Sequence, residues 1–213
     1  MNAPHSMVLK VCGMRDLQNI LALAAIGPDV IGLNFYASSP RVVDIRTLGP
    51  LRDLIPVDIA LAGIFVNHPI EEIMETARIA GLQYIQLHGH EPPDDVTAIQ
   101  SGGYRVIKAF HVTPGFDFEQ TAEYRAADYY LFDTPSTGFG GSGRTFSWEL
   151  LAGYRGATPY FLSGGIGPGH AAAIKSLNLP YPPVGLDINS RFETHPGVKD
   201  IDAITQFFKH FRS

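Results

Sequence analysis

Short apolar runs alternate with segments of helical period along most of the chain. Eight runs rich in β-branched and aromatic residues recur at intervals of roughly 25 residues, which is the length of one βα unit. The runs are residues 7–12, 30–35, 59–66, 84–88, 104–110, 129–133, 159–163 and 184–188. Each run is too short for a buried helix and is typical of a strand in a parallel sheet.

Helix-period segments lie between these runs. The clearest are residues 15–27, 68–81, 167–178 and 198–211. In 68–81, Pro69 stands at the start, acidic residues fill the first turn and Gly81 follows the last apolar position, which together are start and stop signals of a helix. Weaker patterns follow the runs 30–35, 84–88 and 104–110, and only a short helix is expected after 129–133.

Eight βα units predict an α/β fold, a single-domain (βα)₈ TIM barrel over residues 1–213 with 1–6 as a short N-terminal tail. A doubly wound open sheet is the alternative. It rarely needs eight evenly spaced strands, and no G-x-G-x-x-G follows the first run. In a (βα)₈ barrel the chemistry sits at the carboxyl ends of the strands, so polar residues at those positions are candidates for the site.

Composition narrows the function classes. The chain has 45% hydrophobic residues, a formal net charge of −5 and no basic block, so we expect neither nucleic acid nor an anionic membrane as a partner. No apolar run approaches the ~20 residues of a membrane helix, and the N-terminus lacks signal-peptide architecture. Cys12 is the single cysteine, so no intrachain disulfide can form and a cytoplasmic location is expected.

Cys12 ends the first run beside Lys10, on the same face of the strand because side chains alternate. A nearby cation lowers the pKa of a thiol, so we expect a reactive cysteine at the barrel mouth. The alternative interpretation is a small buried hydrophobe.

Asp133 ends the sixth run among aromatic residues. Apolar surroundings raise the pKa of a carboxyl group, which makes it a candidate general acid. The glycine-rich segment 138–145 can close over the site, and its spacing is not that of a P-loop. The alternative role of Asp133 is to cap a turn through Thr134.

Gly164 and Gly165 follow the seventh run, and Asn189, Ser190 and Arg191 follow the eighth. In (βα)₈ barrels the loops after these two strands are the usual phosphate site, and adjacent glycine amides before a helix form an anion nest. We therefore expect a small phosphorylated substrate there. A plain turn is the alternative.

Arg41 and His88 also lie after predicted strands. Arg41 can hold a substrate carboxylate with its planar fork, or it can be a solvated loop residue. His88 and His90 have no third ligand at a recognisable spacing, so we expect no metal and assign His88 to the wall of the site. A thiol and a carboxyl group without metal or redox cofactor favour proton transfer, such as isomerisation, enolisation or aldol-type chemistry.

Several segments, in order, resemble those of phosphoribosylanthranilate isomerases, and the similarity runs from about Leu9 to Phe208. They are K-V-C-G-M, G-L-N-F-Y-A-S-S-P-R, I-F-V-N, Q-L-H-G-H-E, L-F-D-T with G-G-S-G-R-T-F-S-W, L-S-G-G-I, and D-I-N-S-R-F-E-T-H-P-G-V-K-D. The resemblance implies a TIM barrel that catalyses an Amadori rearrangement of N-(5-phosphoribosyl)anthranilate in tryptophan biosynthesis, without a cofactor and as a monomer or homodimer.

The resemblance also implies residue roles. Cys12 matches the family's general base and Asp133 its general acid, while Arg41 matches the arginine for the anthranilate carboxylate. Lys10, His88 and Asp187 are expected in the wall of the site. Many members have glycine where this chain has Arg191, so the loss of an easy positive φ and the gain of a guanidinium are both expected there.

Two rivals remain at this stage. One is a relative that also isomerises the histidine-pathway aminoaldose. Such barrels favour two aspartates, after the first and fifth strands, where this chain has Cys12 and the pair Phe110–His111. The other is a catalytically dead phosphate-binding barrel, which needs neither Cys12 nor Asp133.

Overall fold

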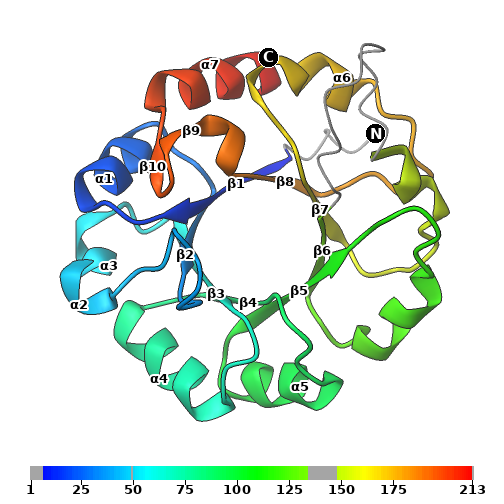
Figure 1. Ribbon diagram of the computed structural model, residues 1–213, viewed down its shortest axis with the longest axis horizontal. Helices are drawn as coiled ribbons and strands as arrows, with labels where there is room; N and C mark the ends of the chain where they lie inside the picture. Colours follow the sequence, from blue (N-terminus) through cyan, green and yellow to red (C-terminus); the bar gives the residue numbers. More distant parts are fainter. Residues whose placement is uncertain (1–6, 49, 134–147, 213) are drawn as a thin grey trace.

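Eight parallel strands form a closed barrel in chain order (Figure 1). The computed structural model describes residues 7–48, 50–133 and 148–212. The strands are β1 (Val8–Met14), β2 (Val30–Asn34), β3 (Ala60–Phe65), β4 (Tyr84–Leu87), β5 (Arg105–His111), β6 (Tyr129–Asp133), β7 (Tyr160–Ser163) and β8 (Gly185–Ile188). Strand β8 pairs with β1, from Val8 against Gly185 to Val11 against Ile188, and this pairing closes the barrel. The predicted fold is therefore confirmed.

Helices surround the barrel (Figure 1). The α-helices are α1 (Leu17–Ala25), α2 (Ile45–Leu48), α3 (Leu51–Leu54), α4 (Ile70–Ala80), α5 (Pro93–Ser101), α6 (Ala171–Lys175) and α7 (Ile201–Arg212). Short 3₁₀ segments are η1 (Phe118–Tyr124), η2 (Trp148–Gly153), η3 (Pro168–His170) and η4 (Ser190–Phe192). None of the helices in the described part of the chain combines the length and apolar character needed to span a bilayer.

Two of the predicted helices differ from the structure in more than a shift of their ends. The predicted helix 198–211 begins only at Ile201, because the two residues β10 (Val198–Lys199) pair antiparallel with β9 (Glu193–His195). The predicted helix 167–178 consists of η3 and the short α6. By contrast, α4 ends as expected, with Gly81 in the left-handed conformation at φ 62°.

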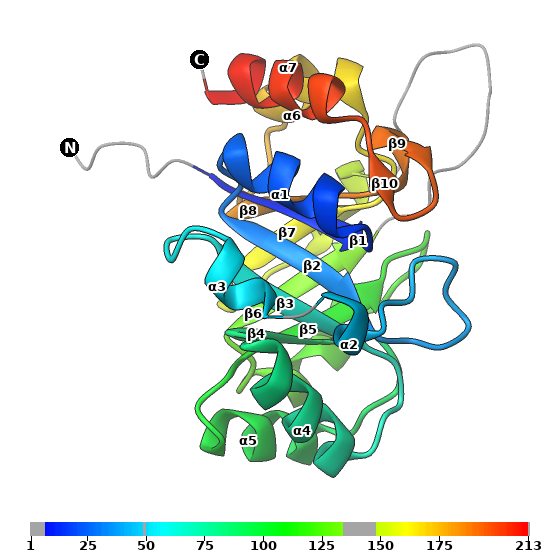
Figure 2. The ribbon, with the colours of Figure 1, turned by 90° about the vertical axis from the view of Figure 1, so that its left-hand side faces the viewer.

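An apolar layer fills part of the barrel interior. Ile107, Ala109, Leu131 and Phe161 pack together there, and the larger apolar core lies separately between the sheet and the helices. His111, Asp133 and Ser163 each follow one member of this layer by two residues, so they share its face of the sheet and lie nearer the carboxyl ends of the strands. Figure 2 shows that hairpin β9–β10 and the loop after β2 lie at the same end of the barrel.

Candidate active site

A cavity of about 740 Å³ lies at the carboxyl ends of the strands. Its lining brings together most of the predicted site residues, namely Cys12, His88, Asp133, Gly164, Gly165, Asp187, Asn189 and Ser190. The other lining residues are Asn34, Tyr36, Ser39, Ile64, Val66, Gln86, His111, Ser163 and Ile166. Lys10, Arg41 and Arg191 are not part of this lining and lie beside or beneath it.

Cys12 reaches the cavity because its neighbour on β2 has no side chain. A Cβ atom on Gly32 would lie 3.0 Å from the Cys12 sulfur and 3.0 Å from its Cα. The residue is only 6% exposed, yet its side chain lines the same cavity as Asp133. Cys12 is thus buried and open to the cavity at once, so the packed-hydrophobe interpretation does not describe it.

The expectation that Lys10 gives Cys12 a low thiol pKa is wrong. Burial raises the pKa of the Cys12 thiol, and this effect outweighs the lowering by the Lys10 ammonium. Nearby Asp187 raises the pKa further, while Lys199 lowers it. Burial and Asp187 thus favour the thiol of Cys12, while Lys10 and Lys199 favour its thiolate, and the net effect is a raised pKa.

Lys10 lies beneath the cavity in a buried ion pair. Its Nζ is 2.7 Å from Oδ1 of Asp187, and the lysine side chain is fully buried. Ser163 donates to the other carboxylate oxygen at 3.3 Å. Burial opposes the charged form of Lys10, but Asp187 and Cys12 together raise the pKa of its ammonium. Lys10 therefore remains protonated beside the sulfur, with its charge balanced by Asp187.

Asp133 ends β6 at the cavity wall. Burial raises the pKa of its carboxyl group, and the negative charge of Asp187 adds to this effect. His111 Nδ1, 3.9 Å from Oδ2, acts in the opposite direction. The direction agrees with the sequence prediction of a proton donor. Thr134 and the glycine-rich segment 138–145, which entered that prediction, lie outside the described residues.

His88 is paired with a residue to which the sequence assigned no role. Gln86 Nε2 lies 2.8 Å from His88 Nδ1, and the other amide atom, Oε1, is buried without a partner in the described structure. Burial lowers the pKa of His88, so its imidazole is neutral. With Nδ1 accepting from Gln86, Nε2 carries the proton and is a hydrogen-bond donor.

The loops after β7 and β8 form one end of the cavity. Gly164 and Gly165 have φ values of 90° and 64°, a conformation that favours glycine. The Trp148 indole donates to the Gly164 carbonyl at 3.0 Å and anchors this turn. Asn189 and Ser190 line the cavity from the other loop.

Arg191 occupies the position after Ser190 without strain. Among the described residues, Asn67 is the only non-glycine with a positive φ, so Arg191 does not need the conformation that glycine would supply. Its Cδ would lie 3.2 Å from a Cβ on Gly167, which places the side chain across the β7 loop. His170 in the same loop has a pKa lowered by burial and by the Arg191 charge. A cation therefore stands beside the predicted phosphate site.

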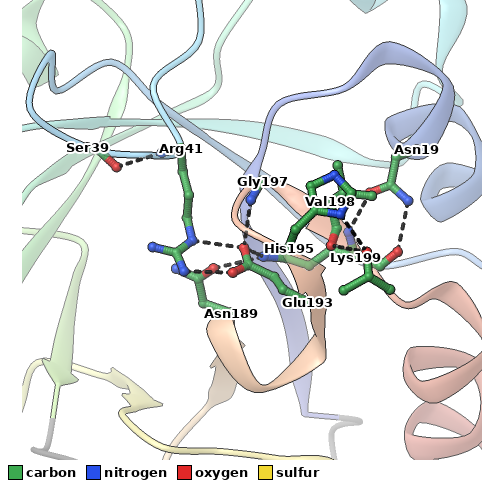
Figure 3. Close-up of polar contacts among 10 residues, drawn as sticks. Asn19, Ser39, Arg41, Asn189, Glu193, His195, Gly197, Val198 and Lys199 are labelled. Atoms are coloured by element: carbon green, nitrogen blue, oxygen red, sulfur yellow. Dashed lines mark hydrogen bonds and ion pairs between the residues drawn. The ribbon is translucent and has the colours of Figure 1, made fainter.

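Arg41 is not a solvated loop residue. Its Nε and Nη2 lie 2.8 and 2.6 Å from Oε1 and Oε2 of Glu193, and Lys199 Nζ lies 2.6 Å from Oε1 (Figure 3). The sequence assigned no role to Glu193 or Lys199. The sequence does show an acid and a lysine, Glu193 and Lys199, on either side of the segment T-H-P-G-V. Their contact, however, depends on the hairpin pairing, which the sequence did not predict.

Cys12 and Asp133 share the cavity with the adjacent glycines Gly164 and Gly165, and buried cations lie beside it. In the residues described, no three His, Cys, Asp or Glu side chains are grouped as ligands for a metal ion. These groups suit acid–base chemistry on a small phosphorylated molecule.

Comparison with known proteins identifies relatives over nearly the whole chain. The family model described as N-(5'phosphoribosyl)anthranilate (PRA) isomerase matches residues 9–210. The N-(5'-phosphoribosyl)anthranilate isomerase of Parabacteroides distasonis is 46% identical over 205 residues, covering 95% of this chain and 92% of that protein.

Solved structures of phosphoribosyl anthranilate isomerases are similar to this chain over nearly its whole length. The phosphoribosyl anthranilate isomerase of Thermotoga maritima superposes with a TM-score of 0.84 at 33% identity, covering 97% of this chain and 98% of that one. A phosphoribosyl anthranilate isomerase in complex with reduced 1-(o-carboxyphenylamino)-1-deoxyribulose 5-phosphate gives a TM-score of 0.81 at 30% identity, with the same coverage.

Proposed function

The chain belongs to the N-(5'-phosphoribosyl)anthranilate isomerase family and is an isomerase of tryptophan biosynthesis, and from this premise we propose that Asp133 and Cys12 carry its reaction as general acid and general base. The substrate is N-(5-phosphoribosyl)anthranilate and the product is 1-(2-carboxyphenylamino)-1-deoxyribulose 5-phosphate. The observation that supports this proposal best is that both side chains line one cavity although they come from β1 and β6, which are not neighbours in the barrel.

Asp133 acts first, on the ribose ring. Its proton passes to the ring oxygen as the bond between that oxygen and C1 breaks, and the anthranilate nitrogen supplies the electron pair that forms the C1–N double bond. A carboxyl group can do this near neutral pH only if it holds its proton, and burial beside Asp187 raises the pKa of Asp133 in that direction.

Cys12 acts second, on the opened chain. The C1–N double bond acidifies the hydrogen on C2, and the Cys12 thiolate removes it to give an enolamine. The enolamine gains a proton on C1 and loses one from its C2 hydroxyl to become the ketone. Lys10 and Lys199 both lower the thiol pKa against the effect of burial, so they increase the share of thiolate available for this step.

The remaining site residues hold the two ends of the substrate. We assign the phosphate to the amides of Gly164 and Gly165 and to Asn189 and Ser190, which line one end of the cavity, and to Arg191, whose guanidinium lies beside that end. Arg41 holds the anthranilate carboxylate. Lys10, His88 and Asp187 form the wall, where the neutral imidazole of His88 donates a hydrogen bond.

Turnover of N-(5-phosphoribosyl)anthranilate by wild-type protein, Cys12→Ser and Asp133→Asn tests the proposal. Removing an acid–base group costs about 10²–10⁴-fold in rate, so both variants should lose at least a hundredfold in kcat with an unchanged thermal transition. Asp58→Asn, at an exposed residue away from the cavity, is the matched control and should turn over normally. Near-normal turnover in either site variant would remove that residue from the mechanism.

A further inference from the structure

Four side chains form a buried polar cluster beside the cavity, which we call the Arg41 cluster: Arg41, Glu193, Lys199 and Asn189 (Figure 3). Glu193 Oε1 accepts from Arg41 Nε at 2.8 Å, from Lys199 Nζ at 2.6 Å and from the Gly197 amide at 3.2 Å. Its Oε2 accepts from Arg41 Nη2 at 2.6 Å. One carboxylate thus organises both cations.

Burial makes these contacts specific. The exposed fractions of the Arg41, Glu193 and Lys199 side chains are 20%, 5% and 0%. Burial alone would raise the pKa of Glu193, but hydrogen bonds from Arg41 and Lys199 outweigh it and lower the pKa to about 2. Glu193 is therefore a fixed anion, and the planar arginine fork binds it through two parallel bonds, which is the most directional form of ion pair.

The charges of the cluster do not cancel. A carboxylate paired with Arg41 alone would neutralise it, and a neutral pair attracts a second carboxylate weakly. Burial lowers the pKa of the Lys199 ammonium, and the hydrogen bond to Glu193 opposes this effect. With Lys199 protonated as a second cation against the same Glu193, the three charged groups carry one net positive charge. Lys199 also donates to Asn189 Oδ1 at 2.8 Å, which ties the cluster to a residue of the cavity wall.

The guanidinium group of Arg41 binds Glu193 through only one of its two hydrogen-bonding edges. Glu193 takes the edge formed by Nε and Nη2, while Figure 3 shows the other terminal nitrogen, Nη1, pointing away from Glu193. Within the described residues Nη1 makes no hydrogen bond. Arg41 also meets the cavity wall, because its amide donates to Ser39 Oγ at 3.1 Å and its Cδ lies with Asn189 Oδ1 over Gly13, where a Cβ would be 2.7 Å from each.

We propose that Glu193 is a positioning residue that orients Arg41 so that its Nη1–Nη2 edge meets the carboxylate of the substrate, and that Lys199 keeps this pair cationic. The inference rests on the proposed function and extends it from Arg41 to the hairpin β9–β10. In that hairpin Glu193 and Lys199 are register partners, so the hairpin serves the aromatic end of the substrate although it lies outside the barrel sheet.

The test compares two substrates that differ only in the carboxylate that the cluster would recognise. One is N-(5-phosphoribosyl)anthranilate and the other is the analogue made from aniline. For Glu193→Gln we expect KM for the anthranilate substrate to rise about tenfold with kcat changed less than about threefold, since a substrate-binding contact is weakened and the proton carriers are untouched. For the aniline analogue, kcat/KM should stay within about twofold of wild type.

A double-mutant cycle with Arg41→Ala isolates the positioning role. If Glu193 acts through Arg41, the double variant should lose no more kcat/KM on the anthranilate substrate than Arg41→Ala alone. Glu193→Asp is the second variant, because it keeps the charge but is too short to reach both guanidinium nitrogens. It should show the same substrate-selective rise in KM.

The outcomes separate the two proposals. Equal losses on both substrates, or additive losses in the cycle, would overturn the positioning role and leave Glu193 a structural residue. Inactive wild-type protein on the anthranilate substrate would instead overturn the proposed function. Thermal unfolding of each variant shows that the kinetics refer to folded protein.

Discussion

A methyl group added at Gly32 tests whether the position of the Cys12 sulfur limits the rate. Gly32 lies on β2 directly beside Cys12 and does not have a positive φ, so alanine can adopt its backbone conformation. The added Cβ would be 3.0 Å from Sγ and from Cα of Cys12, and 3.2 Å from Ile64 Cδ1. Gly32→Ala therefore pushes on the proposed base without changing any ionisable group.

The expected displacement follows from these distances. Ordinary van der Waals contact begins near 3.4 Å, so we expect Cys12 to shift by a few tenths of an ångström away from the added methyl. A misplacement of 1 Å at a reacting group can cost about 10²-fold in rate, so we expect kcat to fall about tenfold, or ~1.4 kcal/mol of transition-state stabilisation. Overpacking of this kind costs about 1–3 kcal/mol in the free energy of unfolding.

The assay is steady-state turnover of N-(5-phosphoribosyl)anthranilate together with the rate at which Cys12, the single cysteine, reacts with a thiol reagent. Gly169→Ala is the matched control, because no atom lies within 4 Å of a Cβ at that position and its φ is not positive. It should match wild type in kcat and in thiol reactivity.

Wild-type kcat in Gly32→Ala would contradict this prediction, provided that thermal unfolding shows the destabilisation expected of a methyl inserted at that point. In that case the sulfur would tolerate displacement, and a role of Cys12 as a base in direct contact with C2 would be untenable. A fall in kcat with unchanged thiol reactivity would place the effect on another residue, such as Ile64.

Two further predictions concern charge. Lys10→Met should raise the thiol pKa of Cys12 further, seen as slower alkylation at a given pH, and should lower kcat at least tenfold. Lys209→Met, on the exposed face of α7, is the control and should change neither quantity. An unchanged thiol titration in Lys10→Met would contradict the role of the Lys10 cation. Glu91 and Glu193 have folded pKa values below their ordinary 4.5, held there against burial by hydrogen bonds from Lys108 and Asn67 to Glu91 and from Arg41 and Lys199 to Glu193. The contribution of these two carboxylates to stability is complete above pH 4.5 and is lost as the pH falls through the folded pKa, which is about 2 for Glu193. The unfolding temperature of the wild-type protein should therefore drop over this pH range. The unfolding temperature of Glu193→Gln should drop less steeply.

The barrel could be predicted because its signal is local and repeated. Each apolar run and each helical period is readable within a short window, and eight repeats leave little choice of architecture. The positions of Cys12 and Asp133 followed from the same pattern, since the fold decides which strand ends meet. The cavity lined by both is therefore a consequence of spacing along the chain.

The ionisation of Cys12 could not be predicted in the same way. Its thiol pKa is a balance between burial and the charges of Lys10, Asp187 and Lys199, and the sequence shows only that Lys10 is near. Burial is the largest of these effects and depends on how deeply the barrel mouth encloses the sulfur. A prediction based on the neighbouring Lys10 alone therefore gave the wrong direction for the shift in the thiol pKa of Cys12.

The Arg41 cluster could not be predicted from the sequence for a different reason. Arg41 and Glu193 are 152 residues apart, and neither side of the pair predicts its partner. The residues 198–199 also fitted the start of a helical period, which concealed the hairpin that places Lys199 against Glu193.

Strands β1 and β8, the first and the last strands of the barrel to be synthesised, pair with each other at the candidate active site. Lys10, whose charge lowers the thiol pKa of Cys12 against the effect of burial, finds its carboxylate partner Asp187 177 residues later in the chain. A nascent polypeptide on the ribosome therefore cannot assemble this centre until β8 has emerged, however well its earlier units have folded. Cutting the chain before Asp187 should leave an inactive fragment whose activity returns only when the missing portion is supplied in trans.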